Sequence, residues 1–284
     1  TIARPEFLSQ ANIRNILLSA SVIGVLALGQ TVVILTGGFD IGIAKSAVVA
    51  GMVVALAAGM GPVALLASIA ATIVIGLVNG VLISRTKVNP FIVTLGMYTI
   101  LTSVALLMND GGSVINLPDW LLGLVQWQFL AMPGIVWWFA GLAVITHIAL
   151  AYTRWGGHIY AVGGNEEAAR LAGIKSNNVL ASAYVVCAVV GGMAGVMLTA
   201  RLGTASPVAL PGAELDSIAA VVIGGTKLSG GFGSIPRTIV GILILMALQS
   251  GLVLMGVNPY YQGMFKGAIL ILAVAVDVIF GKKK

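Results

Sequence analysis

Residues 13–36 read IRNILLSASVIGVLALGQTVVILT, an apolar run with a single charged side chain, Arg14. A transmembrane α-helix needs about 20 mostly apolar residues, because each residue advances about 1.5 Å through a hydrocarbon core about 30 Å thick. This run is long enough to cross a membrane, and comparable runs follow it along the chain. The sequence therefore predicts an all-α protein, a polytopic bundle of transmembrane helices.

The composition supports a membrane protein over its whole length. Of the 284 residues, 59% are hydrophobic and only 8% are charged, and the mean hydropathy is +1.06. A soluble domain has about 25% charged residues. The net charge of +6 follows the membrane-flanking loops, so it does not indicate binding to nucleic acid.

Nine hydrophobic spans are expected along the chain. The weakest runs into Gly224-Gly225-Thr226-Lys227, and there a broken helix is the alternative to a full crossing. The nine spans cover residues 13–36, 42–59, 62–84, 91–109, 133–152, 179–200, 215–228, 236–254 and 262–280.

The distribution of Lys and Arg predicts the orientation of the bundle. Cytoplasmic loops are enriched in these residues. Most of them fall in five regions that alternate with the other loops, 37–45, 85–90, 153–178, 227–237 and the Lys282-Lys283-Lys284 tail. These regions are therefore predicted to be cytoplasmic, which places the start of the chain outside. No signal peptide is visible there, so we expect one further helix before Thr1, making ten in the full protein.

A long polar segment at residues 153–178, TRWGGHIYAVGGNEEAARLAGIKSNN, interrupts the apolar sequence. Glu166 to Ala172 has the composition of a short helix with Asn165 as its N-cap and Gly173 after its end. Two glutamates at the positive end and Arg170 towards the negative end suit the helix dipole. An ordinary solvated loop is the alternative to a segment that contacts a partner.

Three motifs occur in order along the chain, and each contains paired glycines. They are GGFDIG at 37–42, IYAVGGNEEA at 159–168 with LAGI at 171–174, and ELDSIAAVVIGGTKLSGGFGS at 214–234. Together they resemble the membrane-spanning permease subunits of bacterial ribose-type ABC importers. The resemblance extends over essentially the whole chain, from about Pro5 to the Lys tail. One departure is Lys45, where a small or hydroxyl residue is expected, and this lysine would pair with Asp40 or reach lipid phosphates.

The resemblance implies a single permease domain over residues 1–284, in the bacterial plasma membrane and in contact with its lipid. It also implies ten helices, a homodimer of permeases, and docking of the central loop into a cytoplasmic ATP-binding subunit that holds ATP and Mg. A sugar-binding protein would dock on the outer face, and this chain would need no cofactor of its own. The ATPase-coupling residues would be Gly163, Gly164, Asn165, Glu166, Glu167, Arg170, Leu171 and Gly173.

The outer loops are expected to receive the binding protein. The longest, 109–133, includes a predicted short helix over 119–130, whose tryptophans could alternatively anchor the chain at the membrane interface. The docking residues expected are Trp120, Trp127, Arg201, Glu214 and Tyr260.

Polar residues within the spans are candidates for lining a translocation path, with helix packing as the alternative for each. They are Asn79, Thr94, Tyr98, Thr99, Thr102 and Gln249. Asp40 follows a Gly-Gly break and is predicted to cap a helix that begins at Ile41, although a buried acid in a membrane is often functional.

The sequence offers no basis for an enzyme. Glu214 and Asp216 have no evident catalytic partner, and the glycine-rich turns lack the GxxxxGK[ST] spacing of a phosphate loop. Three alternatives to a sugar permease remain open. One is an ABC permease for a nucleoside or other small polar solute, and another is a membrane scaffold. The last is a stand-alone secondary transporter, which would need ionisable residues in the membrane, from among Asp40, Lys45, His147, Lys266 and Asp277.

Overall fold

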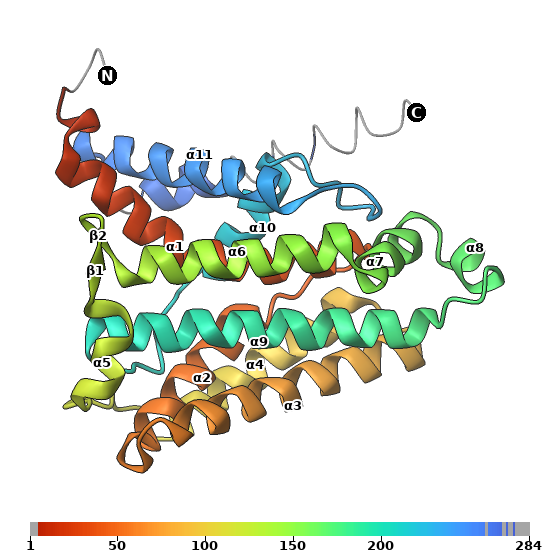
Figure 1. Cartoon of the computed structure of the whole chain (residues 1–284), viewed down its shortest axis with the longest axis horizontal. Coiled ribbons are helices and arrows are strands. Elements are labelled where there is room, and N and C mark those ends of the chain that lie inside the picture. The colour runs from red at the N-terminus through yellow and green to blue at the C-terminus, as the bar shows by residue number, and fades with distance from the viewer. Residues whose placement is uncertain (1–4, 259–260, 269–270, 272–274, 276–284) are drawn as a thin grey trace.

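The computed structural model describes residues 5–258, 261–268, 271 and 275 as a bundle of roughly antiparallel helices (Figure 1). In this part of the chain, six helices are long and apolar enough to cross a membrane. They are α1 (Gln10–Leu35), α3 (Val63–Thr86), α4 (Pro90–Leu107), α6 (Gly134–Tyr152), α9 (Ser176–Leu202) and α11 (Ile235–Leu254).

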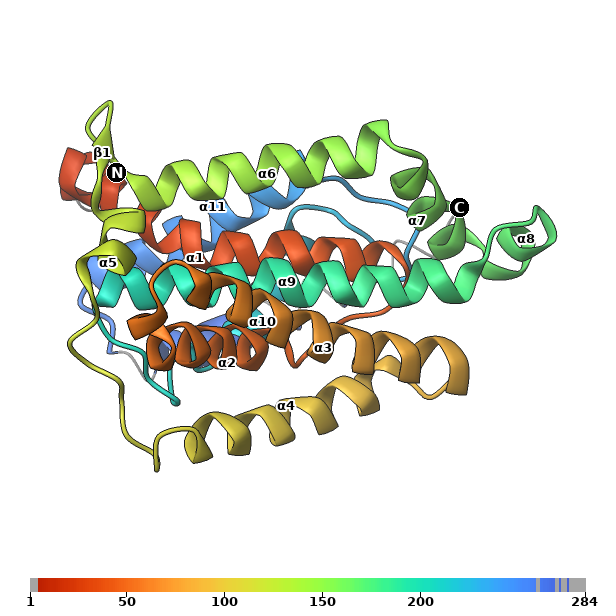
Figure 2. The same cartoon turned by 60° about the horizontal axis from the view of Figure 1, so that its bottom comes forward.

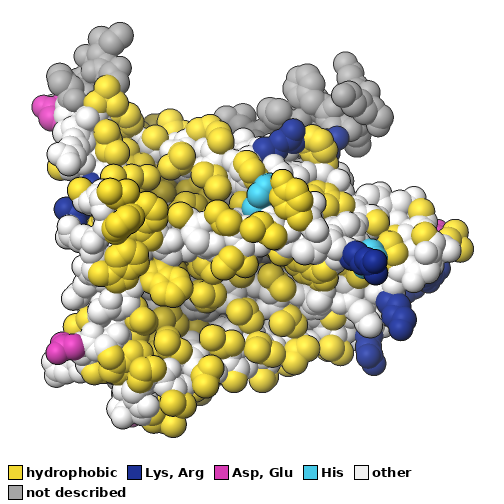
Figure 3. Space-filling view, viewed as in Figure 1, with side chains coloured by type: hydrophobic (Ala, Val, Ile, Leu, Met, Phe, Trp, Pro, Cys, Tyr) yellow, Lys and Arg dark blue, Asp and Glu magenta, His cyan; other side chains and the backbone are white. Residues whose placement is uncertain are grey.

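Cationic side chains gather at one end of the bundle, which we call the basic end (Figure 3). It includes the end of α3, the region between α6 and α9, and the turn between α10 and α11. Its cations are Arg85, Lys87, Arg154, Arg170, Lys175, Lys227 and Arg237. The bias has the sign predicted for the cytoplasmic side.

Helix α9 lies at the centre and packs against α1, α2 (Ile43–Leu56) and α3, and the views in Figures 1 and 2 agree on this. On α3, Gly76 and Gly80 both face the backbone of α9, and a Cβ atom on Gly80 would lie 2.6 Å from the carbonyl oxygen of Ala181. Glycines four residues apart let two transmembrane helices approach closely. This contact fixes α3 on α9.

Two of the nine predicted spans are too short to be full crossings. Helix α2 has 14 residues and α10 (Ala213–Ile223) has 11. At 1.5 Å per residue these helices are about 21 and about 16 Å long, against about 30 Å of hydrocarbon. The spans predicted at 42–59 and 215–228 are therefore not continuous full-length helices, and the second agrees with the alternative of a broken helix. Most of the span predicted at 262–280 lies outside the described residues, of which 261–268 are helical.

Both short helices begin in the middle of the bundle. Ile43, the first residue of α2, lies against Gly191 in the middle of α9, with its Cγ1 2.7 Å from where a Cβ of that glycine would be. From there α2 runs away from the basic end, while α10 runs towards it and ends beside Arg237. The two N-termini therefore lie at a similar depth, and the two helices occupy opposite halves of the bundle.

Small elements cover both ends of the bundle. Near the N-terminus and after α2 lie two 3-10 turns, η1 (Pro5–Leu8) and η2 (Ala58–Met60). At the end opposite the basic end, α5 (Asp119–Gln126) precedes strands β1 (Gln128–Phe129) and β2 (Met132–Pro133), which pair antiparallel. The helix predicted at 119–130 is therefore present but ends earlier, because the chain turns back as a hairpin. At the basic end, α7 (Arg154–Gly164) and α8 (Glu166–Leu171) connect α6 to α9.

Candidate functional site: a projecting helix and a buried ionic cluster

Helix α8 begins after the predicted N-cap, Asn165, and ends at Leu171, one residue before the predicted end at Ala172. The Asn165 side-chain oxygen accepts a hydrogen bond of 2.9 Å from the Ala168 backbone N–H. At the other end, Gly173 has a positive φ of 85°, and the Ile174 N–H donates to the Ala169 carbonyl at 3.0 Å. This is the Schellman arrangement, which satisfies the carbonyl groups at a helix end. The six-residue helix is thus capped at both ends, and Ala169 packs it against the core.

Helix α8 projects from the basic end of the bundle, at the far right of Figure 1. Of its six residues only Ala169 is buried. Leu171 is 83% exposed, although it is a large apolar side chain. A capped helix on which Glu166, Glu167, Arg170 and Leu171 are all exposed has the form of a docking element.

Helix α7, which the sequence did not reveal, attaches α8 to the bundle. The Trp155 indole N–H donates to the Ser182 hydroxyl on α9 at 2.8 Å, and the Tyr160 hydroxyl donates to the Gly233 carbonyl at 3.0 Å. Burial raises the pKa of Tyr160, so the hydroxyl keeps the proton that it donates. Four glycines hid the helical pattern of α7, and its signal was the apolar face made by Trp155, Ile159 and Val162.

The three glycine motifs of the sequence meet at the end of α7. Gly163 packs directly against the carbonyl oxygen of Leu35 at the end of α1, and no Cβ would fit there. The same carbonyl accepts a hydrogen bond of 2.9 Å from the Gly231 N–H. Gly230 in turn lies beside Gly163 and Gly37. The helix that carries α8 is therefore in contact with α1 and with the turn after α10.

A buried ionic cluster lies where the N-termini of α2 and α10 come together. Lys45 on α2 is 6% exposed, and Glu214 on α10, 7% exposed, is within its electrostatic reach. The Lys45 ammonium group also lies 5.3 Å from the centroid of the Tyr98 ring on α4. A cation at a helix N-terminus opposes the helix dipole, so the carboxylate and the aromatic face compensate for an unfavourable position. Lys45 forms no ion pair with Asp40, so that expected pairing is wrong.

The cluster continues to Lys266, whose ammonium nitrogen lies 2.8 Å from a carboxylate oxygen of Asp216. Asp216 is buried, and this is the only salt bridge among the described residues. Ionisable side chains inside a membrane bundle are rare, and they mark solute or ion pathways. From the sequence, Glu214 and Asp216 are predicted at the outer end of a span, because each apolar segment is expected to cross the whole membrane. In the structure α10 begins in the middle of the bundle, so both residues lie there.

Asp40 lies in the segment between α1 and α2, fully buried. It does not cap α2, which begins at Ile43 with Gly42 as its N-cap and no side-chain hydrogen bond, so the predicted cap at Ile41 is wrong. Among the described residues, no hydrogen bond of good geometry reaches the Asp40 carboxylate oxygens or the Asn79 amide, but the Gly42 backbone N–H and the Asn79 side chain lie close enough to favour the carboxylate. The Gln30 amide, oriented to satisfy both contacts, bonds the Asp40 backbone.

The structure separates the predicted path residues into groups. Thr94, Tyr98 and Thr102 lie at intervals of four on one face of α4, and α4 packs against α2. Thr99 is exposed, and its hydroxyl donates to the Leu95 carbonyl of the same helix. Asn79 lies beside Asp40, and Gln249 lies on α11. Only the α4 group contacts the ionic cluster, through Tyr98.

Three of the predicted docking residues lie at the end opposite the basic end. The Trp120 indole N–H donates to the Ala58 carbonyl at 3.2 Å, and Trp127, 44% exposed, donates to Leu124 at 2.9 Å. Arg201 donates to the Leu18 carbonyl at 3.1 Å. Glu214 is buried in the ionic cluster, so its predicted place on the outer surface is wrong. Tyr260 lies outside the described residues.

In the part of the chain that the structure describes, no group of His, Cys, Asp or Glu is arranged to hold a metal ion.

The family model described as "Branched-chain amino acid transport system / permease component" matches residues 12–274. The ribose import permease protein RbsC of Escherichia coli (strain K12) is 39% identical over 280 residues, covering 96% of this chain and 87% of that protein. RbsC of Bacillus subtilis (strain 168) is also 39% identical, over 98% of this chain and 88% of that protein. The L-arabinose ABC transporter permease protein AraH of Azospirillum brasilense is 34% identical, over 96% and 81%. No solved structure matches the chain significantly.

Proposed function

Because this chain belongs to the family of permease components of the branched-chain amino acid transport system type, we propose that it is the permease subunit of an ABC importer for a monosaccharide. The relatives named above are permeases for ribose and L-arabinose. Others, at 33% and 34% identity, are named for D-allose and for galactose and methyl galactoside. The chain is a multi-pass membrane protein, and its proposed location is the bacterial plasma membrane.

The observation that carries this proposal is the projecting helix α8. Its two caps and its exposed Leu171 suit a rigid element that inserts into a groove of a partner. In the proposed assembly that partner is a cytoplasmic ATP-binding subunit, which holds the ATP and Mg, and this chain needs no cofactor of its own. Residues 153–178 form the coupling loop of a single permease domain, with contacts from Gly163, Gly164, Asn165, Glu166, Glu167, Arg170, Leu171 and Gly173.

A movement of α8 has a direct connection to the interior of the bundle. Helix α7 transmits it through Trp155 to α9, through Tyr160 to the turn after α10, and through Gly163 to the end of α1. Helix α2 directly follows α1 in the chain, and α10 directly precedes the turn that Tyr160 contacts. ATP-driven closure of the partner would therefore reorient the two short helices at the ionic cluster as rigid bodies.

The proposed translocation path passes the ionic cluster and the α4 face formed by Thr94, Tyr98 and Thr102. Short or interrupted helices that meet near the middle of a membrane form the solute sites of many transporters. Among the described residues, the path would then be surrounded by six long helices and the two half-length helices, and a second copy of the chain would complete it. The ten-helix count of the full protein stays a prediction.

The end opposite the basic end is proposed to receive a sugar-binding protein. Trp120, Trp127 and Arg201 lie there, on α5, beside the β1–β2 hairpin and at the end of α9. Their hydrogen bonds to the backbone hold them in fixed positions, which suits a preformed docking surface.

The experiment that tests the function is sugar uptake into proteoliposomes holding this chain, its ATP-binding subunit and its binding protein. We expect uptake to require all three proteins and ATP. The double variant Glu166→Lys/Arg170→Glu should abolish uptake and sugar-stimulated ATP hydrolysis. The matched control, Glu6→Lys/Arg14→Glu, makes the same charge reversal on exposed residues near the N-terminus and should transport normally. Normal uptake by the α8 variant would contradict the coupling role.

A stand-alone secondary transporter is favoured by one observation, the ionic cluster in which Lys45, Glu214 and Asp216 are buried and Asp216 pairs with the partly exposed Lys266. Uptake by this chain alone, driven by an ion gradient and indifferent to ATP, would establish it in place of the ABC function. A nucleoside permease would instead need all three proteins but would take up nucleoside and not sugar.

A further inference from the structure

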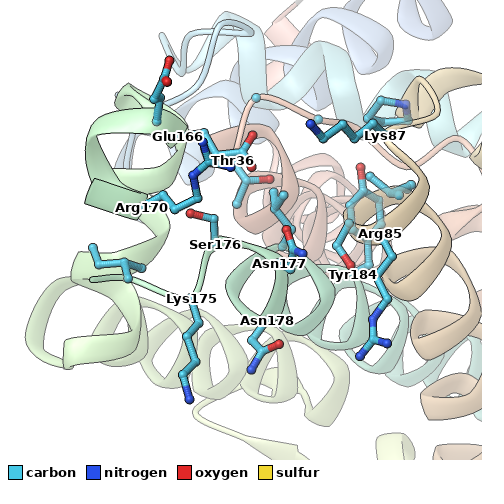
Figure 4. Close-up of a pocket in the computed structure, with 18 of the residues that line it drawn as sticks. Thr36, Arg85, Lys87, Glu166, Arg170, Lys175, Ser176, Asn177, Asn178 and Tyr184 are labelled. Atoms are coloured by element: carbon cyan, nitrogen blue, oxygen red, sulfur yellow. The ribbon is translucent and has the colours of Figure 1, made fainter. Parts of the chain in front are cut away.

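A hollow of about 1060 Å³ opens at the basic end (Figure 4). It lies between the end of α3, the linker to α4, α8 and the start of α9. Its ionisable lining consists of Arg85, Lys87, Arg170, Lys175, Glu166 and Glu167. Within the described residues none of the four cations forms a salt bridge. A concave site with an excess of unpaired positive charge attracts anions.

Two buried hydroxyl groups belong to the lining of the same hollow. Ser176 is 4% exposed and Tyr184 is 0% exposed, and both lack a hydrogen-bond partner among the described residues. Buried hydroxyl groups in proteins are nearly always hydrogen-bonded. Both oxygens are covered in this structure, so an acceptor-rich ligand in the hollow would take a hydrogen bond from each after a small rotation of the side chain.

The start of α9 adds a third feature. This helix has 27 residues, its N-cap residue Lys175 makes no side-chain capping bond, and Ser176, Asn177 and Asn178 in its first turn line the hollow. The Ser176 and Asn178 N–H groups already donate to the Ile174 and Lys175 carbonyls at 2.9 Å, so it is chiefly the helix dipole at this end that favours a bound anion. Guanidinium, ammonium and hydroxyl donors around a helix N-terminus match the oxygens of a phosphate.

We propose that this hollow binds a phosphate group, held by Arg85, Lys87 and the first turn of α9. The buried hydroxyl groups of Ser176 and Tyr184 would donate hydrogen bonds to the same group. The phosphate would belong to an anionic lipid headgroup or to a small soluble phosphate. The hollow lies beside α8, so an occupant there would affect how α8 meets its partner. This goes beyond the transport function, and it does not depend on which solute is carried.

The first test uses the purified chain in neutral detergent, with thermal unfolding followed by tryptophan fluorescence. Inorganic phosphate is titrated against chloride at constant ionic strength. The variant Arg85→Gln/Lys87→Gln should weaken the apparent phosphate affinity roughly tenfold or more, as expected for lost charge-assisted hydrogen bonds. The control Arg154→Gln/Lys227→Gln makes the same charge change at the basic end but outside the hollow, and it should respond like the parent. Ser176→Ala should weaken binding without changing the unfolding midpoint in chloride.

The second arm identifies the source of the phosphate. The same variants are placed in nanodiscs of phosphatidylcholine, with or without phosphatidylglycerol. Stabilisation by inorganic phosphate in detergent, lost only in the Arg85/Lys87 variant, indicates a soluble ligand. Stabilisation by phosphatidylglycerol with the same dependence indicates a lipid headgroup.

The proposal is overturned if neither probe stabilises the parent, or if both double variants lose the response equally, since that reflects bulk charge. It is also overturned if the Arg85/Lys87 variant keeps its phosphate response and loses only binding to the ATP-binding subunit. In that case Arg85 and Lys87 contact the ATP-binding subunit and do not bind phosphate. None of these outcomes bears on whether sugar uptake requires the three proteins, so the two proposals fail independently.

Discussion

The Leu35 carbonyl oxygen accepts a hydrogen bond of 2.9 Å from the Gly231 N–H, while Gly163 packs against the same oxygen. One backbone group thus joins the end of α1, the end of α7 and the glycine-rich turn after α10. These segments are far apart in sequence. Their contact explains why paired glycines occur in all three motifs, because side chains there would hold the backbones apart.

Gly163→Ala should destabilise the protein, because the added Cβ would overlap the Leu35 carbonyl. Overpacking of this kind costs about 1–3 kcal/mol, and here the obstacle is backbone that cannot rotate away. We expect a lower midpoint of thermal unfolding in detergent together with slower uptake. The neighbouring variant Gly164→Ala meets open space and serves as the control. Equal midpoints for the two variants would show that the contact is looser than the structure has it.

Asn165→Ala should fray α8 while leaving the bundle intact. Loss of a side-chain N-cap costs about 1 kcal/mol, and a six-residue helix has little else to maintain it. Stimulation of ATP hydrolysis by sugar should fall, with the unfolding midpoint unchanged. Asn165→Asp keeps a capping oxygen and should restore stimulation. Full activity in the alanine variant would mean that the partner's groove, and not the cap, orders α8.

Lys266 and Asp216 should show energetic coupling in a double-mutant cycle. Asp216→Asn, Lys266→Gln and the double variant are compared by thermal unfolding in detergent. Residues in direct contact couple by about 0.5–3 kcal/mol, and the partly buried position of this pair reduces solvent screening. The reversed pair Asp216→Lys/Lys266→Asp should recover part of the stability lost in the single variants. Additive effects would show that the two residues do not interact.

Asp40→Asn should raise the stability of the folded chain. A buried polar group without a partner costs about 1–3 kcal/mol, and more when it is charged. The amide has the same shape and can pair with Asn79. We expect a higher unfolding midpoint, with the exposed Asp119→Asn as a control that leaves it unchanged. A lower midpoint would reveal that the folded protein gives the carboxylate a favourable interaction.

Local signals in the sequence were sufficient for α8, because Asn165, the two glutamates and Gly173 are neighbours along the chain. They were also sufficient for the long apolar helices. The sequence indicates a broken helix as an alternative for α10, but it does not indicate the half-length of α2, since Phe39 and Ile41 keep the segment before it apolar and hydropathy continues through the break. For the same reason, the grouping of Lys45 with Glu214 depends on tertiary contacts between residues distant in sequence.

The two short helices also set the depth at which the proposed path can change sides. Each occupies only part of the roughly 30 Å of hydrocarbon, and they begin at a similar depth, in opposite halves of the bundle. In the proposed cycle, small sideways displacements of these two helix ends would expose a solute at that depth first to one compartment and then to the other, with no need for a long tunnel to open or close.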